Sequence, residues 1–257
     1  MTDALRFDEL GCTFRSKRQV TVALDGVSLA VAPGEFVSLL GPSGCGKSTL
    51  LKIAAGLVAQ TAGSVTLLGR PVREPQRDIG FVFQRAALLE WRSTRKNILL
   101  QAEMRDLPRA RAEERADQLI AMAGLRGFES AYPHELSGGM QQRVALCRAL
   151  LHEPPILLMD EPFGALDALT REQMNVELYR IYRETGTTIV FVTHSIPEAI
   201  YLSNRVVVMT PRPGRIAEIL DVGLPVERDY GTTMASPQLA ALADRARALL
   251  GASAHQE

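Results

Sequence analysis

The sequence contains few cysteines, and their spacing excludes two common ways of stabilising a fold. Only three occur among 257 residues, at Cys12, Cys45 and Cys147, and no two of them form a C-x-x-C pair. Disulfide frameworks and structural zinc sites need paired or closely spaced cysteines. We therefore expect a reduced, cytosolic protein, and we interpret Cys45 as a small loop residue rather than a redox centre.

Long apolar runs and an excess of charge of one sign are also missing. No apolar run approaches the ~18 residues of a membrane-spanning helix. The segment Met1–Leu10 contains three acidic residues and lacks the apolar stretch of a secretory signal. Lys and Arg together number 29, as do Asp and Glu, so the formal net charge is zero. Bulk charge therefore predicts no polyanion-binding surface, and we expect no nucleic-acid partner.

The most informative motif that is present is a glycine-rich segment at residues 41–49. It matches the phosphate-loop pattern G-x-x-x-x-G-K-[ST]. An apolar run at Phe36–Leu40 precedes it and an apolar helical stretch at Thr49–Leu57 follows it, which is the context that such a loop needs. A glycine-rich turn would match by accident in about one chain in a hundred of this size. The expected nucleotide-binding residues here are Gly41, Pro42, Ser43, Gly44, Cys45, Gly46, Lys47, Ser48 and Thr49.

The residue types of this loop suit a phosphate chain and a magnesium ion. Glycines let the backbone wrap closely around an anion, and the N–H groups of a helix N-terminus favour negative charge. Lys47 can reach the β- and γ-phosphates, and the hydroxyl of Ser48 can ligate Mg²⁺. We therefore expect a nucleoside triphosphate and Mg²⁺ as cofactors.

Strands and helices alternate along most of the chain. β-rich runs predict strands at Leu5–Leu10, Val20–Leu24, Val27–Val31, Phe36–Leu40, Val65–Leu68, Ile79–Phe83, Ile156–Met159, Thr188–Val192 and Arg205–Met209. Helical spacing and composition predict helices at Arg109–Ala123, Ser137–Leu151, Thr170–Thr185, Ile196–Leu202 and, after Ser236-Pro237, up to Gly251. This alternation indicates an α/β fold with a largely parallel sheet. The helix-rich stretch from about residue 86 to 151 indicates a separate lobe.

Two further segments carry groups suited to phosphate chemistry. The apolar run Ile156–Met159 leads into Asp160, which suits a magnesium ion held through its waters, and Glu161, which can deprotonate an attacking water. Ser137-Gly138-Gly139 opens a helix and offers a second anion site. A plain N-cap would explain the serine of this segment. It would not explain two glycines in helical positions, where they reduce stability.

Taken in order, these motifs resemble those of the ATP-binding subunits of ABC transporters. The phosphate loop matches the Walker A motif of that family, and Leu136–Arg143 matches its LSGGQ-type signature, with Met140 where glutamine is commonest. Ile156–Glu161 matches Walker B followed by the catalytic glutamate. The remaining matches are Gln84 for the Q-loop, Ala165-Leu166-Asp167 for the D-loop and His194 for the switch histidine. The resemblance covers about residues 5–225.

The resemblance implies the α/β fold of a P-loop NTPase. This fold has a RecA-like, mostly parallel sheet core, an antiparallel β subdomain and an inserted helical subdomain, here at about residues 86–151. A single ATPase domain would span residues 1–225. Residues 226–257 would form a C-terminal tail with one short amphipathic helix, which we expect to pack on its own domain.

The resemblance also implies how ATP and Mg²⁺ are handled. Two copies would face each other head to tail in a homodimer, with ATP bound between them. The residues expected to bind ATP from the second copy are Ser137, Gly138, Gly139 and Asp167. Magnesium would be bound by Ser48, Gln84 and Asp160. Glu161 would polarise the attacking water, and His194 would hold the γ-phosphate.

Phe14 lies about 27 residues before the loop and resembles the aromatic residue that stacks on adenine in the family. The family more often has tyrosine at that position. The alternative interpretation of Phe14 is a core or edge aromatic residue.

Two segments resemble the nitrate, sulfonate and taurine importer branch of the family. They are Leu88–Ser93, which contains Trp91, and Val206–Ile216. This branch implies an integral-membrane permease that carries a small, for example anionic or sulfonate-like, solute, and a solute-binding protein that acts through the permease. The chain would then be peripheral to the cytoplasmic face of the bacterial inner membrane. Trp91 would be either an anchor at the permease interface or a core residue of the helical lobe.

Other functions of this family fit the sequence less well. Soluble members that act on nucleic acid or ribosomes typically carry two cassettes, a coiled-coil insertion or basic tracts, none of which we find. A non-hydrolytic scaffold is disfavoured by the intact Glu161 and His194. Exporters often fuse the membrane domain into the same chain, so an exporter is also disfavoured.

Overall fold

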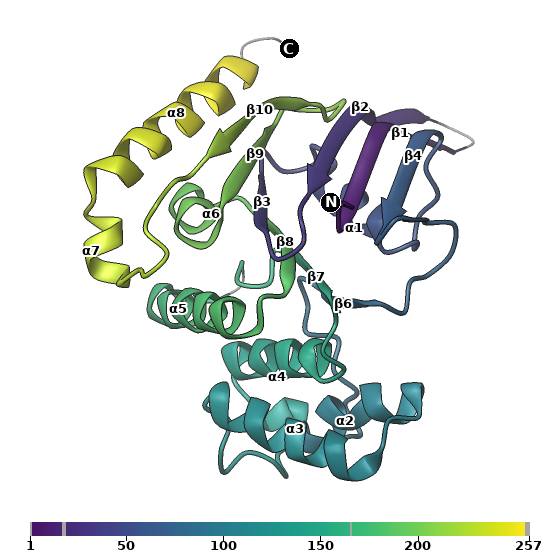
Figure 1. The fold of residues 1–257 in the computed structure, drawn as a ribbon, viewed down its shortest axis with the longest axis vertical. Helices are drawn as coiled ribbons and strands as arrows, with labels where there is room; N and C mark the ends of the chain where they lie inside the picture. The colour runs from purple at the N-terminus through teal and green to yellow at the C-terminus, as the bar shows by residue number, and fades with distance from the viewer. Residues whose placement is uncertain (1, 17–18, 165, 255–257) are drawn as a thin grey trace.

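Strands in two sheets and a group of helices make up the computed structural model, which describes residues 2–16, 19–164 and 166–254 (Figure 1). The strands are β1 (Leu5–Arg15), β2 (Val20–Val31), β3 (Phe36–Leu40), β4 (Ala62–Leu67), β5 (Arg70–Pro71), β6 (Ile79–Val82), β7 (Ile156–Asp160), β8 (Thr188–Thr193), β9 (Arg205–Met209) and β10 (Ile216–Asp221). The helices are α1 (Lys47–Ala54), α2 (Thr94–Arg105), α3 (Arg109–Met122), α4 (Gly138–Leu150), α5 (Ala168–Thr185), α6 (Ile196–Leu202), α7 (Tyr230–Met234) and α8 (Pro237–Ala254), with a 3₁₀ turn at Pro133–Glu135.

The larger sheet has the strand order β10-β9-β3-β8-β7-β6. Its pairs from β9 through β6 are all parallel, and β10 pairs antiparallel with β9 at one edge. Every residue of β3, β7 and β8 is buried. Strands covered on both faces by helices read as continuous apolar runs, and the prediction of a largely parallel sheet from such runs is confirmed.

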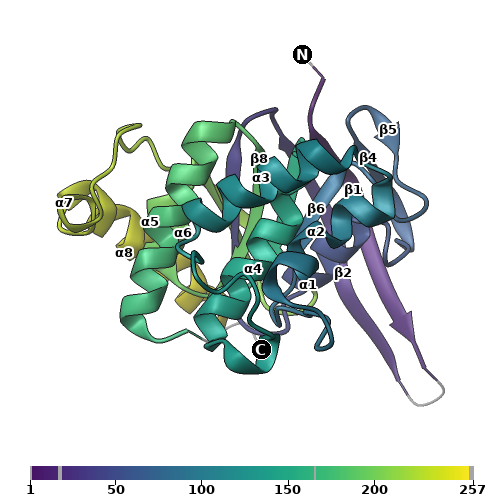
Figure 2. The same cartoon turned by 90° about the horizontal axis from the view of Figure 1, so that it is seen from below.

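The smaller sheet is antiparallel and has the order β2-β1-β4-β5. Figure 2 shows β1 and β2 extending as a ribbon beyond the rest of the molecule. The prediction of two strands at Val20–Leu24 and Val27–Val31 is wrong, because a bulge with Gly26 at φ 64° lets one strand, β2, continue through. The expected antiparallel β subdomain is thus present.

The helical lobe consists of α2, α3 and α4 and lies beyond the β6 edge of the larger sheet (Figure 1). Its interior is a cluster of buried side chains that continues from α4 onto that sheet. Helix α2 was missed from the sequence because its buried face includes polar residues. One of them, Asn97, accepts from the N–H of Leu89 at 2.8 Å and donates to the carbonyls of Leu89 and Arg92 at 3.1 and 2.8 Å.

The C-terminal part packs on the larger sheet, as we expected. Leu239, Ala243 and Ala246 of α8 join a buried cluster with residues of α6, β9 and β10. Residues 226–254 contain two helices, α7 and α8, so the expectation of one short helix is wrong. Helix α8 continues to Ala254, past the predicted end at Gly251. The boundary of the tail at residue 225 stays a prediction. None of the helices in the described part of the chain combines the length and apolar character needed to cross a bilayer.

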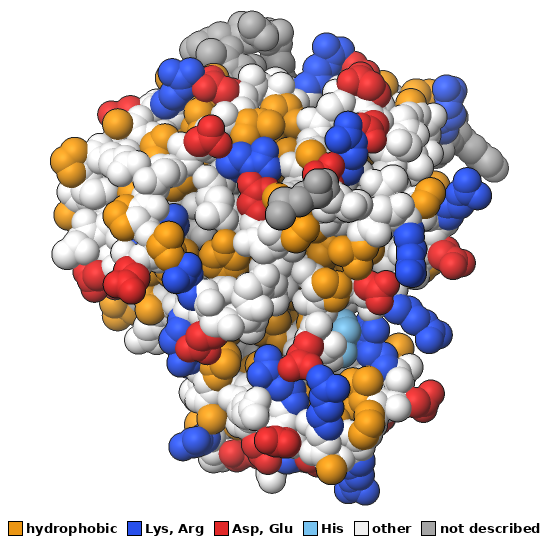
Figure 3. Space-filling model, in the orientation of Figure 1, with side chains coloured by type: hydrophobic (Ala, Val, Ile, Leu, Met, Phe, Trp, Pro, Cys, Tyr) orange, Lys and Arg blue, Asp and Glu red, His pale blue; other side chains and the backbone are white. Residues whose placement is uncertain are grey.

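Charged side chains of both signs are mixed on one face of the molecule, in keeping with the formal net charge of zero. On the face shown in Figure 3, basic and acidic side chains are interspersed over both the sheets and the helical lobe.

Trp91 lies on the surface of the helical lobe, so its interpretation as a core residue is wrong. Its exposed fraction is 74%, whereas Ile98 on the adjoining α2 is fully buried. We therefore expect Trp91→Ala to change the free energy of unfolding by less than about 0.5 kcal/mol. Ile98→Ala should cost about 2–5 kcal/mol. Urea denaturation of both variants measures the difference, and a comparable loss for Trp91→Ala would contradict the surface position.

Candidate active site

The phosphate loop connects β3 to α1, and its glycines have steric reasons to be there. Gly44 and Gly46 have φ values of 78° and 102°, which side chains rarely adopt. A Cβ on Gly46 would also lie 2.6 Å from Leu24 Cδ2 and 2.8 Å from the carbonyl oxygen of Ala23. The helix then begins at Lys47, two residues earlier than predicted, and ends at Ala54.

Lys47 is held at the centre of this loop. Its Nζ donates to the carbonyl oxygens of Gly41 at 2.7 Å and Pro42 at 2.9 Å, and it lies 3.7 Å from Cys45 Sγ. Only 4% of Lys47 and 1% of Cys45 are exposed. The ammonium is therefore preorganised where the loop would bind phosphate. The burial of Cys45 fits its interpretation as a small loop residue rather than a redox centre.

A hydrogen bond ties the loop to the next-but-one strand of the sheet. Ser48 Oγ donates to Asp160 Oδ1 at 2.7 Å, and Asp160 is the last residue of β7. Burial raises the pKa of the Asp160 carboxyl, while the bond from Ser48 opposes that rise. A hydroxyl and a carboxylate oxygen are ligands that Mg²⁺ accepts, and this ion usually keeps several waters and binds few protein groups. These two side chains therefore fit the predicted metal site.

Glu161 and His194 meet just beyond the ends of β7 and β8. Glu161 Oε2 lies 3.5 Å from His194 Nδ1, and the side chains are 22% and 57% exposed. The backbone of Glu161 has φ 45°, a conformation that costs about 1 kcal/mol or more and that concentrates at functional sites. Its N–H donates to the carbonyl of Val192 at 3.0 Å, which anchors it between the strands. The structure thus brings together the two predicted catalytic residues.

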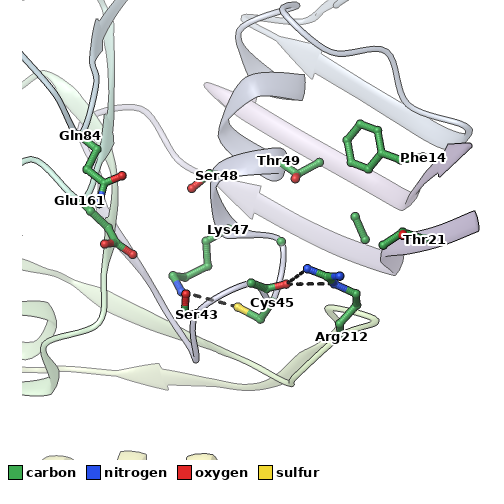
Figure 4. A pocket seen from close by; sticks show the side chains of 13 residues that line it. Phe14, Thr21, Ser43, Cys45, Lys47, Ser48, Thr49, Gln84, Glu161 and Arg212 are labelled. Carbon is green, nitrogen blue, oxygen red and sulfur yellow. Dashed lines mark hydrogen bonds between the residues drawn. The ribbon is translucent and has the colours of Figure 1, made fainter. Parts of the chain in front are cut away.

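Lys47, Ser48 and Glu161 border one cleft of about 280 Å³ (Figure 4), whereas Asp160 and His194 lie outside its lining. Residues 43–49 form its floor, and Gln84 and Glu161 border one side of it. Phe14 from β1 and Thr21 from β2 border the other side. Phe14 is 46% exposed, so its interpretation as a core aromatic is wrong. The exposed ring fits the expected adenine platform, which stays a prediction.

Residues expected to act in trans lie outside the lining of this cleft. Ser137 is exposed and caps α4 by accepting from the N–H of Met140 at 3.3 Å. A Cβ on Gly139 would lie 2.7 Å from Thr170 Cγ2, so close packing on α5 explains this glycine. Gly138 is exposed, and a Cβ there would meet nothing within 4 Å, so packing does not explain it.

Asp167 has a local task at the start of α5. It accepts from Thr170 N at 3.0 Å and from Thr170 Oγ1 at 2.7 Å, and these bonds lower the pKa of its carboxyl. Its exposed position leaves room for the expected contact with a second copy, which stays a prediction. Ala165 of the same motif lies outside the described residues.

Sequence reasoning did not predict that Arg212 and Gly214, in the segment Thr210–Arg215 between β9 and β10, belong to the site. Gly214 N–H donates to the carbonyl of Ala23 at 3.0 Å, and Arg212 borders the cleft. The sequence marked this segment only as a branch feature. Nothing in its spacing reveals that it packs against a loop more than 160 residues earlier.

Gly214 fixes the position of the phosphate loop, since a Cβ there would lie 1.9 Å from the carbonyl oxygen of Cys45. We expect Gly214→Ala to displace the loop and weaken ATP binding by about 10- to 100-fold. Gly231→Ala is the matched control, because the nearest atom to its Cβ would be 3.6 Å away. Calorimetric titration with ATP measures both variants, and equal affinities would refute the role of Gly214.

Comparison with known proteins supports the interpretation of the cleft as an ATP site of the ABC transporter type. A family model described as ABC transporter matches residues 24–164. The taurine import ATP-binding protein TauB of Rhizobium johnstonii is 46% identical over 252 residues, which cover 96% of each chain. The aliphatic sulfonates import ATP-binding protein SsuB of Bacillus subtilis is 45% identical over 219 residues, which cover 85% of each chain.

Solved structures agree with the fold. The dimeric post-hydrolysis state of the ATP-binding cassette MJ0796, bound to ADP and Pi, superposes with a TM-score of 0.76 at 33% identity. The match covers 86% of this chain and all of that one. The expected P-loop NTPase fold is thus confirmed. With the cleft, the family model and these relatives in agreement, the chain belongs to the ABC transporter family, as an ATP-binding cassette with the fold of an ATPase.

Proposed function

We propose that the chain is the ATP-hydrolysing subunit of an ABC importer that takes up a small anionic or sulfonate-like solute. The observation that carries the proposal is the convergence of Lys47, the Ser48–Asp160 pair and the Glu161–His194 pair on one edge of the larger sheet. Relatives are named for the import of taurine and aliphatic sulfonates, which carry a sulfonate group, and of nitrate, which is a small anion.

Each part of the cleft has a chemical task in ATP hydrolysis. Residues 41–49 bind the phosphates through backbone N–H groups and the ammonium of Lys47. Ser48, Asp160 and Gln84 would hold Mg²⁺, which supplies neutralisation of phosphate charge when bound. Glu161 accepts the proton of the attacking water. The neighbouring His194 orients the γ-phosphate and Glu161.

A second copy completes the site in this proposal. Ser137 and Gly138 are exposed at the start of α4, where N–H groups favour an anion, and they lie outside the lining of the chain's own cleft. Head-to-tail pairing would place them on the triphosphate of the partner. The related cassette MJ0796 has been solved as a dimer, which supports this arrangement.

Permease coupling is assigned to the segment after Gln84. Its Trp91 is 74% exposed, and large exposed aromatic residues serve as anchors in protein interfaces. The permease would select the solute together with a solute-binding protein. The cassette would then work as a peripheral subunit at the cytoplasmic face of the bacterial inner membrane. No nucleic acid takes part.

Replacing the general base should separate hydrolysis from binding. We expect Glu161→Gln to retain ATP affinity and to lose ~10²–10⁴-fold in turnover. Phosphate release and calorimetric titration measure the two quantities. Hydrolysis at the parent rate would refute the role of Glu161 as general base.

Replacing the loop lysine should act on binding itself. Hydrogen bonds to charged groups contribute about 1.5–3 kcal/mol, so Lys47→Ala should weaken ATP binding by about 10- to 150-fold. Lys96→Ala, an exposed lysine on α2, is the control and should bind as the parent does. Unchanged ATP affinity of Lys47→Ala would contradict the loop assignment.

The assembly is tested with the hydrolysis-deficient variant. Glu161→Gln with MgATP should form a dimer in analytical ultracentrifugation, and adding Lys47→Ala to it should abolish the dimer. Expressed with its neighbouring genes, the chain should co-purify with a membrane permease. A variant that binds MgATP yet stays monomeric and captures no membrane subunit would overturn the proposal.

A further inference from the structure

Two arginines three residues apart in the segment Thr210–Arg215 have different surroundings. Arg215 forms an ion pair with Asp25 of β2. In the described parts of the chain, no carboxylate pairs with Arg212, whose Nε and Nη2 donate to the carbonyl oxygen of Gly44 at 3.3 and 3.2 Å. A guanidinium bound only to a carbonyl retains its full positive charge and further N–H donors.

This unpaired cation borders the phosphate cleft. Arg212 lines the cleft together with Gly44, Thr21 and Phe14. Figure 4 shows it beside Cys45 and Thr21, with Glu161 and Gln84 on the opposite side of the loop. The general base marks where the γ-phosphate lies, so Arg212 is at the end of the cleft that faces the nucleoside.

We propose that Arg212 is a further ATP-binding residue that contacts the α-phosphate, on the side of the triphosphate away from Glu161. The inference rests on the proposed function, since it needs the cleft to bind ATP. The planar guanidinium suits phosphate oxygens and binds them through parallel N–H bonds. Its bond to Gly44 restricts the side chain beforehand, which lowers the entropy lost on binding.

ATP and ADP share the α-phosphate that Arg212 is proposed to contact. Loss of Arg212 should therefore lower the affinities for both nucleotides by the same factor. Loss of a contact to the γ-phosphate would instead lower the affinity for ATP alone, because ADP has no γ-phosphate. This distinguishes Arg212 from His194, which lies 3.5 Å from Glu161 at the other end.

The test compares Arg212→Gln with Arg215→Gln in the full-length protein. Glutamine at 212 retains an N–H donor for the Gly44 carbonyl but removes the charge, and the substitution at 215 removes a neighbouring charge away from the cleft. Affinities for ADP and ATP are measured by calorimetry with EDTA, so that no hydrolysis occurs. Thermal melts without nucleotide show that both variants are folded.

We expect Arg212→Gln to weaken ADP and ATP equally, by about tenfold or more, because a charge-assisted hydrogen bond is lost. Arg215→Gln should bind both as the parent does. Parent-like affinity of Arg212→Gln would overturn the proposal, as would a loss confined to ATP or an equal loss in Arg215→Gln. If the parent protein bound neither nucleotide, the proposed function itself would fail, which is a separate result.

Discussion

The site depends on one constraint, namely that parallel strands end at the same edge of a sheet. The phosphate loop follows β3, Glu161 follows β7 and His194 follows β8, so groups far apart in sequence meet there. Ligands of open α/β sheets bind outside the carboxyl ends of the strands for this reason. The hydrogen bond from Ser48 to Asp160 locks two of these ends together.

Much of this arrangement could be predicted because burial on both faces leaves a plain signal. The runs that became β3, β7 and β8 are apolar throughout, and each motif follows directly after one. Helix α2 gave no such signal, because it is held partly by the amide of Asn97 bonding to a preceding loop. Edge strand β10 was also missed, because it is only partly buried and its sequence therefore shows no continuous apolar run.

Contacts between distant segments could not be predicted from the sequence. The packing of Gly214 on the carbonyl of Cys45 depends on where β9 lies beside β3, which no local pattern encodes. Likewise, only the structure separates the two glycines that open α4, since one packs on Thr170 and the other faces open space. A motif can therefore contain one glycine that packing explains and one that packing does not explain, and its pattern alone does not tell them apart.

The amide of Gln142 on α4 donates to the carbonyl of Gln84 at 2.7 Å. One end of α4 carries Ser137, and its middle is thus fastened to the strand end that borders the chain's own cleft. In the proposed pair, a helix pulled toward a neighbour's triphosphate would draw Gln84 with it. ATP binding in one cleft would then shift Gln84 at the other cleft, and the movement would be transmitted through α4 of the helical lobe.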